Sequence, residues 1–269
     1  MRKWIYGGLM ALFSVIFLIS GGLLADYYVK TQKAADDFHE IADIVEQVKV
    51  TSPVFTPQET QPEVDLVAVE HPATGETVMV LPEYAEIFTM NPDTVGWISI
   101  ADTRVNYPVM HHPEKKDYYL YKDFYQKYSS SGSIYIREDC DVFRPTDNVT
   151  IYGHRMNSGA MFADLLKYKD EQFYIDHPHI QFDTLRERHY YVIMSVFTIS
   201  ASVNNGFAYH QMTDAADRAE FDAFVEQCKT RAFYDTGVTA VYGDKLITLS
   251  TCELGDSSRR VVVVAKRIA

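Results

Sequence analysis

Three residues at the edges of strand-like segments have side chains that could together perform nucleophilic catalysis. Cys252 ends the apolar run "KLITLST" and precedes the turn-like "ELGDSS", and His154 stands where "NVTIY" stops. A thiol needs a base or a cationic neighbour to become nucleophilic, and imidazole is the usual one. Arg260 opens the last apolar run, and a guanidinium beside a thiol lowers the thiol pKa and neutralises an oxyanion. These residue types indicate acyl transfer through a cysteine.

Each of these residues also has a simpler interpretation. A cysteine in a β-rich domain is often a small buried hydrophobe, which is how we interpret Cys140 and Cys228. A strand-end histidine can simply hydrogen-bond in a loop, and an arginine at a strand start is usually solvated. Alternation along a strand puts Arg259 and Arg260 on opposite faces. The catalytic interpretation rests on the combination, because all three functional groups occur at strand edges.

The elements that must position these groups are mostly short strands. From about residue 77, runs rich in β-branched and aromatic residues are punctuated by Gly, Pro, Asp or Asn. The runs are 77–81, 96–100, 104–112, 132–138, 148–154, 179–184, 189–202, 245–251 and 259–268. Helical segments interrupt them at 82–91, 161–177 and 213–233. Many strands with few helices predict a mainly β fold, a closed or nearly closed β-barrel decorated with helices.

The N-terminus predicts a membrane anchor. Arg2 and Lys3 precede an uncharged stretch that continues to Asp26. About 22 residues at 1.5 Å per residue are long enough for a hydrocarbon core of roughly 30 Å. A cleaved signal peptide is the alternative, but its apolar stretch is usually only about 7–15 residues, and "LLA" at 23–25 is a poor cleavage site. Positive charges before the helix predict that the C-terminal bulk faces outward.

The next fifty residues connect this anchor to the strands. "KTQKAADDFHEIADIVEQVKV", at 30–50, has one-sided helical spacing and predicts an amphipathic helix packed on the domain. Residues 51–76 are rich in Pro, Thr and Glu and predict a linker or an irregular covering segment. We therefore expect an anchor at 1–25, a juxtamembrane helix and linker at 26–76 and a catalytic barrel at 77–269.

Composition argues against several other classes of function. A net charge of −12 disfavours nucleic acid and anionic lipid surfaces as partners, because phosphate binding needs clustered Lys and Arg. Three cysteines are too few and too oddly numbered for a disulfide framework. The histidines at 111–112 and at 177 and 179 lack Cys or carboxylate neighbours at metal-site spacing, so we predict that they are solvated and hold no metal.

The motifs around these residues resemble those of class B sortases. "TLSTC", followed eight residues later by Arg and "VVVVAK", resembles the sortase active-site signature. "YGH" followed by "MFADLLKY" resembles the catalytic-histidine segment, and "NPDTVGWISI", "VNYPVM" and "DYYLYKDF" resemble the early strands. The resemblance extends from about residue 83 to the C-terminus and includes the helix at about 213–233. It implies a closed sortase-type β-barrel of about eight strands behind an N-terminal transmembrane helix.

The resemblance also implies a role for each catalytic candidate. Cys252 would be the nucleophile, His154 the general acid and base, and Arg260 the residue that stabilises the oxyanion. Arg259 is the rival for the last role. Sortases cleave a sorting signal after Thr and pass the acyl-thioester to an amine, and the resemblance implies neither a metal nor an organic cofactor.

The implied substrate residues are Leu120, Ser250, Thr251 and Glu253. Class B substrates generally carry Asn-Pro-X-Thr followed by a small or polar residue, so the implied partner is a secreted protein with such a C-terminal sorting signal. The other implied partner is a peptidoglycan cross-bridge or pilin amine. Lys116 stands where class B members often have Asn, which predicts a difference in how the first signal residue is recognised. We expect the residue 203–236 insertion and aromatic side chains to wall the groove. The implied location is the cell membrane of a Gram-positive bacterium, single-pass, with the catalytic domain outside.

Two other functions remain open at this point. A Cys-His cell-wall peptidase or amidase would use the same nucleophile but hydrolyse its acyl-enzyme. A membrane-anchored binding module would hold Cys252 as an inert core residue. That model predicts that Cys252→Ala changes little beyond stability.

Overall fold

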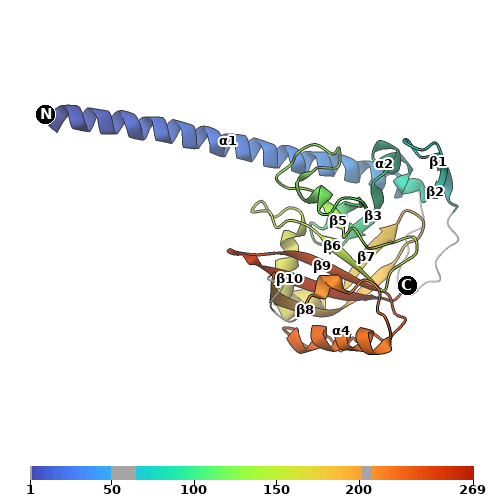
Figure 1. Cartoon of the computed structure of the whole chain (residues 1–269). Coiled ribbons are helices and arrows are strands. Elements are labelled where there is room, and N and C mark those ends of the chain that lie inside the picture. The colour runs from blue at the N-terminus through green and yellow to red at the C-terminus, as the bar shows by residue number, and fades with distance from the viewer. Residues whose placement is uncertain (1, 50–64, 202–206) are drawn as a thin grey trace.

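The computed structural model describes residues 2–49, 65–201 and 207–269. One continuous helix, α1 (Arg2–Lys49), begins the chain, and its N-terminal half projects away from the rest of the protein (Figure 1). Its C-terminal part packs on the barrel through Phe38, Ile41 and Val45, which are buried. The predicted amphipathic helix is therefore confirmed up to Lys49, as the last part of a longer helix.

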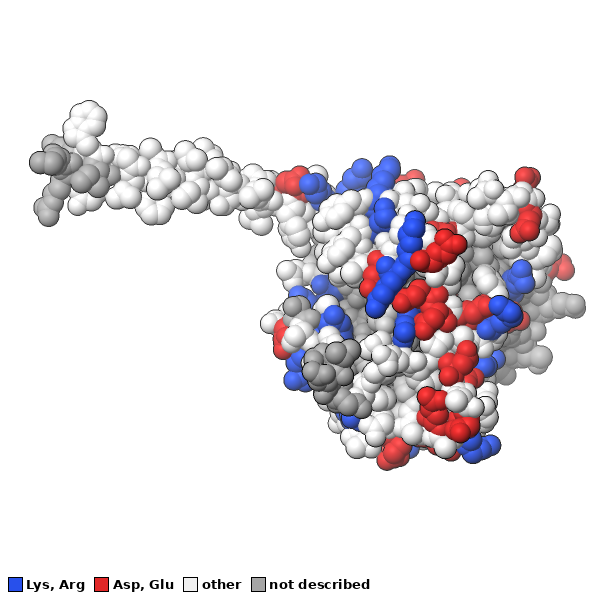
Figure 2. Space-filling view, in the orientation of Figure 1, with Lys and Arg blue, Asp and Glu red and all other residues white. Residues whose placement is uncertain are grey.

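The length and composition of α1 make it a candidate membrane span. Side chains of residues 6–30 are exposed. Figure 2 shows that the projecting part of α1 carries no charged side chain between its undescribed tip and the junction with the barrel.

Eight strands of the described chain form a closed barrel in the order β10-β8-β7-β3-β4-β5-β6-β9. They are β3 (Thr94–Ser99), β4 (Asn106–Met110), β5 (Ile134–Ile136), β6 (Asn148–Tyr152), β7 (His179–Thr184), β8 (Tyr190–Ser200), β9 (Leu246–Glu253) and β10 (Asp256–Arg267). The pairs β4–β5 and β6–β9 are parallel, and the other neighbours are antiparallel. The predicted closed barrel is confirmed.

A small sheet and several helices surround this barrel. The helices are η1 (Pro82–Tyr84), α2 (Ala85–Met90), η2 (Tyr118–Tyr121), η3 (Phe162–Lys169), α3 (Glu171–Asp176), η4 (Tyr209–Gln211) and α4 (Arg218–Arg231). The predicted helix at 161–177 is divided at Asp170, whose carboxylate accepts a hydrogen bond from the Gln172 N–H and begins α3. The predicted helix at 213–233 begins only after Asp217, whose side chain caps α4 in the same way.

One prediction about the connecting segment is wrong. Residues 67–70, expected to be linker, form β1 (Val67–Glu70), which pairs antiparallel with β2 (Thr77–Val80). Gly75 permits the reversal between them, with φ of 72°. Residues 50–64, the larger part of the predicted linker, lie outside the described residues, as do 203–206 of the predicted insertion.

Alternation along the last strand separates two hydrophobic cores. Val263 belongs to the larger core, which also includes Trp97 and residues of α1. Val262 and Val264 face outward into a second core shared with α4. Helix α4 and helix α1 lie on opposite sides of the barrel (Figure 1). In the register of β9 and β10, Cys252 and Arg260 lie two residues beyond the pair formed by Ser250 and Val262.

Candidate active site

Cys252 and Arg260 lie opposite each other on neighbouring strands. β9 and β10 are antiparallel, and their register pairs these two residues directly. Residues opposed in this way share a face of the sheet, with Cβ atoms about 4.5–5.5 Å apart. Arg259 belongs to the other face, by the alternation that separates Val262 from Val263. The arginine on the same side as the thiol is therefore Arg260.

His154 follows the strand on the other side of β9. β6 runs parallel to β9 with Tyr152 beside Ser250, and the Gly153 N–H donates to the Ser250 carbonyl at 3.2 Å. Two residues further along each strand, the same register puts His154 level with Cys252. Parallel pairing thus brings together two residues that are almost a hundred positions apart in the chain.

The ring of His154 is held by the segment that follows β4. Its Nε2 lies 2.7 Å from the Leu120 carbonyl oxygen. A carbonyl oxygen only accepts, so Nε2 carries the proton of this hydrogen bond and Nδ1 is the nitrogen left for proton transfer. The Tyr121 ring packs against the imidazole at 5.4 Å between centroids. These contacts fix which nitrogen is available for chemistry.

One cavity of about 440 Å³ joins these groups. His154, Cys252 and Arg260 all line it, and so do three of the four predicted substrate residues, Leu120, Ser250 and Thr251. Lys116 lines it as well. The candidates drawn from separate segments of the sequence therefore surround a single space large enough for several residues of an extended peptide.

Ser250 and Thr251 line the cavity with side chains that already have partners. The Ser250 hydroxyl lies 2.7 Å from the Tyr209 hydroxyl. The Thr251 hydroxyl donates to the Gly153 carbonyl at 2.8 Å, which ties β9 to the residue before His154. Both are almost fully buried. They hold the strands and the cavity wall in place, and their substrate role stays a prediction.

Glu253 is outside the residues that line the cavity. Its carboxylate forms ion pairs with Lys169 at the end of η3 and with Arg259, at 3.0 Å. Both pairs lie on the face opposite Cys252. The predicted contact of Glu253 with substrate therefore has no geometric support, although the residue directly follows the cysteine.

We expected aromatic side chains and the 203–236 insertion in the groove wall, but the sequence singled out no residue of that wall except Leu120. Tyr135, Tyr152, Phe207 and Tyr209 line the cavity, and Phe207 and Tyr209 come from that insertion. Burial raises the pKa of Tyr209, with the nearby Cys252 adding to this and the Ser250 hydrogen bond and Arg260 opposing it. The sequence offers little indication that Phe207 and Tyr209 would line a site, because "FAYHQM", at 207–212, precedes α4 and has no strand pattern.

The other cysteines and histidines differ from the candidates. Burial raises the pKa of Cys140 to about 12 and raises that of Cys228 as well, so both are inert thiols, as predicted. The prediction of solvated histidines holds for His179, which is exposed, but is wrong for His111, His112 and His177, which are half-buried. His111, for example, contacts the Glu138 carbonyl through Nε2 at 3.3 Å.

Comparison with known proteins identifies the family. The profile of the sortase domain matches residues 98–268. The chain belongs to the sortase family. It is 31% identical over 179 residues to sortase B of Listeria monocytogenes, covering 65% of this chain and 68% of that protein. It is 29% identical over 191 residues to sortase B of Staphylococcus aureus, covering 70% and 76%.

Solved structures of sortase B have the same fold. A Staphylococcus aureus sortase B–substrate complex superposes with a TM-score of 0.72 at 23% identity, over 89% of this sortase and 98% of that chain. Bacillus anthracis sortase B in complex with AAEK1 gives a TM-score of 0.71 at 29% identity, over the same shares, 89% and 98%. The predicted class B sortase is confirmed, and the protein is a cysteine transpeptidase of the sortase type. This membership decides against the non-catalytic binding module.

Proposed function

We propose that this sortase cleaves an Asn-Pro-X-Thr-type sorting signal after Thr and transfers the acyl group to an amine. Cys252 is the nucleophile, His154 the general acid and base, and Arg260 the oxyanion-stabilising residue. The observation that carries this assignment is the register of β6, β9 and β10, which puts all three residues at one level around one cavity.

The reaction follows from these positions. The Cys252 thiolate attacks the carbonyl carbon of the signal Thr, a C–S bond forms, and the carbonyl oxygen becomes an oxyanion beside the Arg260 guanidinium. His154, which took the thiol proton on Nδ1 when the thiolate formed, gives that proton to the leaving nitrogen as the oxyanion collapses and the C–N bond breaks, which leaves an acyl-thioester. The incoming amine then gives a proton to His154 while its nitrogen attacks the thioester, and the C–S bond breaks to restore the thiolate.

The aromatic cavity suits the proline of such a signal. Proline fixes φ near −65° and lowers the entropy that a peptide loses on binding, and flat tyrosine rings pack well against its ring. Tyr135, Tyr152 and Tyr209 supply these surfaces. Lys116, at the rim of the same cavity, is the residue we expect to read the first position of the signal.

The proposed location rests on the apolar stretch of α1 and on the charges that precede it. Residues 4–25 anchor the enzyme in the cell membrane, with Arg2 and Lys3 inside and the barrel outside. The signal then reaches the cavity from a secreted protein, and the acceptor is a cell-wall or pilin amine. Fractionation of cells and sequencing of the mature N-terminus test the anchor, and a soluble species that starts near Asp26 would contradict it.

A peptide panel tests the substrate and the reaction together. Quenched peptides with Asn, Leu, Asp or Lys before Pro-X-Thr are incubated with and without triglycine, and the products are identified by mass spectrometry. We expect cleavage after Thr, fastest for Asn, and a Thr–glycine product when the amine is present. Faster cleavage of the Leu peptide would contradict the signal assignment. Free acid alone at high amine concentration would favour the peptidase or amidase alternative.

A further inference from the structure

The wall of the cavity opposite His154 has little regular structure of its own. Phe207, Ala208, Tyr209 and His210 line the cavity, and only the short 3-10 turn η4 lies among them. Through its hydroxyl, Tyr209 contacts Ser250, two residues before the nucleophile. A segment without helix or strand bonds needs other contacts to keep such an arrangement, so the question is what holds it.

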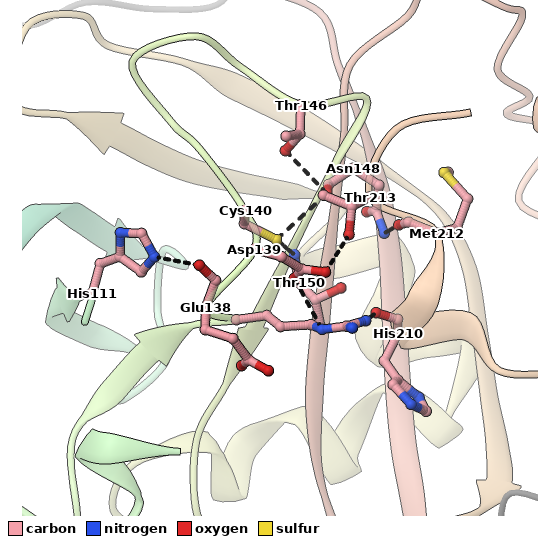
Figure 3. Close-up of polar contacts among 11 residues, drawn as sticks. His111, Glu138, Asp139, Cys140, Thr146, Asn148, Thr150, His210, Met212 and Thr213 are labelled. Atoms are coloured by element: carbon pink, nitrogen blue, oxygen red, sulfur yellow. Dashed lines mark hydrogen bonds and ion pairs between the residues drawn. The ribbon is translucent and has the colours of Figure 1, made fainter. Parts of the chain in front are cut away.

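Asn148, the first residue of β6, fastens the end of this wall. Its side-chain amide donates to the Met212 carbonyl at 2.9 Å, and its backbone N–H donates to the Thr213 carbonyl at 2.9 Å. Its side-chain oxygen accepts from the Thr248 hydroxyl at 2.8 Å. Asn148 is completely buried. Figure 3 shows Asn148, Met212 and Thr213 together with His210.

Arg137, which directly follows β5, reaches the same segment from the other end. Its Nη1 donates to the His210 carbonyl, and its Nε pairs with Asp139 at 2.9 Å. The second oxygen of Asp139 accepts from the Thr213 hydroxyl at 3.4 Å. A guanidinium is planar and presents its donors in fixed directions. The arginine and the aspartate together therefore hold both His210 and Thr213.

We propose that Arg137 is a positioning residue of this sortase, which fixes the Phe207–His210 wall so that the sorting-signal peptide finds a preformed groove. The proposal rests on the proposed function, because it concerns how that peptide binds. In the described part of the chain, Arg137 is not one of the residues that line the cavity. It acts through the main chain of His210, and no contact joins it to the thiol, the imidazole or Arg260 in the described part of the chain.

The charges around His210 agree with this geometry. Burial lowers the pKa of His210, and the positive charges of Arg137 and Lys116 lower it further, against the opposing effects of Asp139 and Glu138. The guanidinium is thus close enough to act on the ring as well as on the carbonyl. His210 stays neutral at neutral pH, and its ring packs edge-on against Tyr209 at 5.3 Å.

Arg137→Gln tests the proposal, with Arg144→Gln as the matched control. Arg144 lies in the same loop and pairs with Asp141, but its side chain is 93% exposed. We expect Arg137→Gln to raise KM for the signal peptide about tenfold, as for a lost hydrogen bond to a charged group, with kcat nearly unchanged. Iodoacetamide should alkylate Cys252 at the wild-type rate, because the thiol and its neighbours stay in place. Arg137→Lys should recover part of the loss, and Arg144→Gln should change nothing.

Hydrogen exchange supplies a readout that does not depend on activity. Amides of residues 207–213 should exchange about tenfold faster in Arg137→Gln, and at the wild-type rate in Arg144→Gln. Unchanged exchange there, or an equal KM increase in both variants, would overturn the proposal. If the wild-type enzyme cleaves no Asn-Pro-X-Thr peptide, the proposed function fails, and the exchange data still decide whether Arg137 holds the wall. Should Arg137→Gln fail to fold, Arg137→Lys gives the same comparison with smaller effects.

Discussion

The two faces of the β9–β10 pair put similar residues to different uses. On one face, Cys252 and Arg260 are direct cross-strand partners and line the cavity. On the other, Glu253 and Arg259 form an ion pair at 3.0 Å near the surface. Cys252 and Glu253 are neighbours in β9, and Arg259 and Arg260 are neighbours in β10. The alternation of side chains along each strand therefore decides which arginine lies on the same face as the thiol.

The surroundings of Arg259 and Arg260 explain why only one of the two arginines is expected to act in catalysis. Arg259 has a carboxylate partner, and its side chain is half exposed, so water and Glu253 satisfy its charge. Arg260 lies opposite Cys252, the proposed nucleophile, and lines the cavity, where its positive charge is beside the position of the expected oxyanion. One hydrogen bond from Arg260 Nη1 to the Arg259 carbonyl, at 3.1 Å, helps to orient it.

The largest effect should come from removing Cys252, the proposed nucleophile. Cys252→Ala should abolish peptide cleavage and leave the melting temperature within about 2 °C of wild type, because the residue is half-buried at a strand end. Cys228→Ala is the matched control. It should keep activity but lower the free energy of unfolding by about 1 kcal/mol, since it opens space in the core under α4. Cleavage by Cys252→Ala would exclude Cys252 as the nucleophile.

The next largest effects should come from the two groups beside the thiol. Arg260→Ala and His154→Ala should each lower kcat/KM by roughly 10²-fold or more, the usual scale for losing an oxyanion partner or a general acid. Steady-state kinetics with the Asn peptide measure both. Arg260→Lys should recover only part of the loss, because an ammonium lacks the planar fork. A loss under tenfold for either alanine variant would remove that residue from the proposed catalytic set.

Much of the barrel and of the candidate site could be predicted from local sequence. Runs of β-branched and aromatic residues between Gly, Pro, Asp and Asn predicted the barrel strands, and the strand-end positions of Cys252 and His154 indicated the site. The parallel pairing of β6 with β9 could not be read from either strand, because register over about a hundred residues depends on barrel closure. β1 was missed because its few residues follow a Pro-rich stretch.

Contacts between residues far apart in the sequence could not be predicted either. The family resemblance implied a substrate contact for Glu253, but it gave no indication of the contact with Lys169, which lies 84 residues away. Arg137 lies at the end of the predicted strand 132–138 and Tyr209 in the predicted 203–236 insertion, but no local pattern indicated that these two segments contact each other. Local patterns therefore predicted the elements, whereas contacts between distant segments determine which side chains share the cavity.

The smallest effect should come from the face opposite the cavity. Arg259→Ala removes a partly exposed ion pair, which is worth only about 0–1 kcal/mol. We expect kcat/KM to change by less than about threefold. The melting temperature should fall only slightly, because Glu253 keeps its ion pair with Lys169. Steady-state kinetics and thermal unfolding of Arg259→Ala and Arg260→Ala, measured side by side, compare the two faces directly. If Arg259 proved essential and Arg260 dispensable, β10 would have to be shifted by one residue relative to its register in this structure. The oxyanion role would then pass to Arg259.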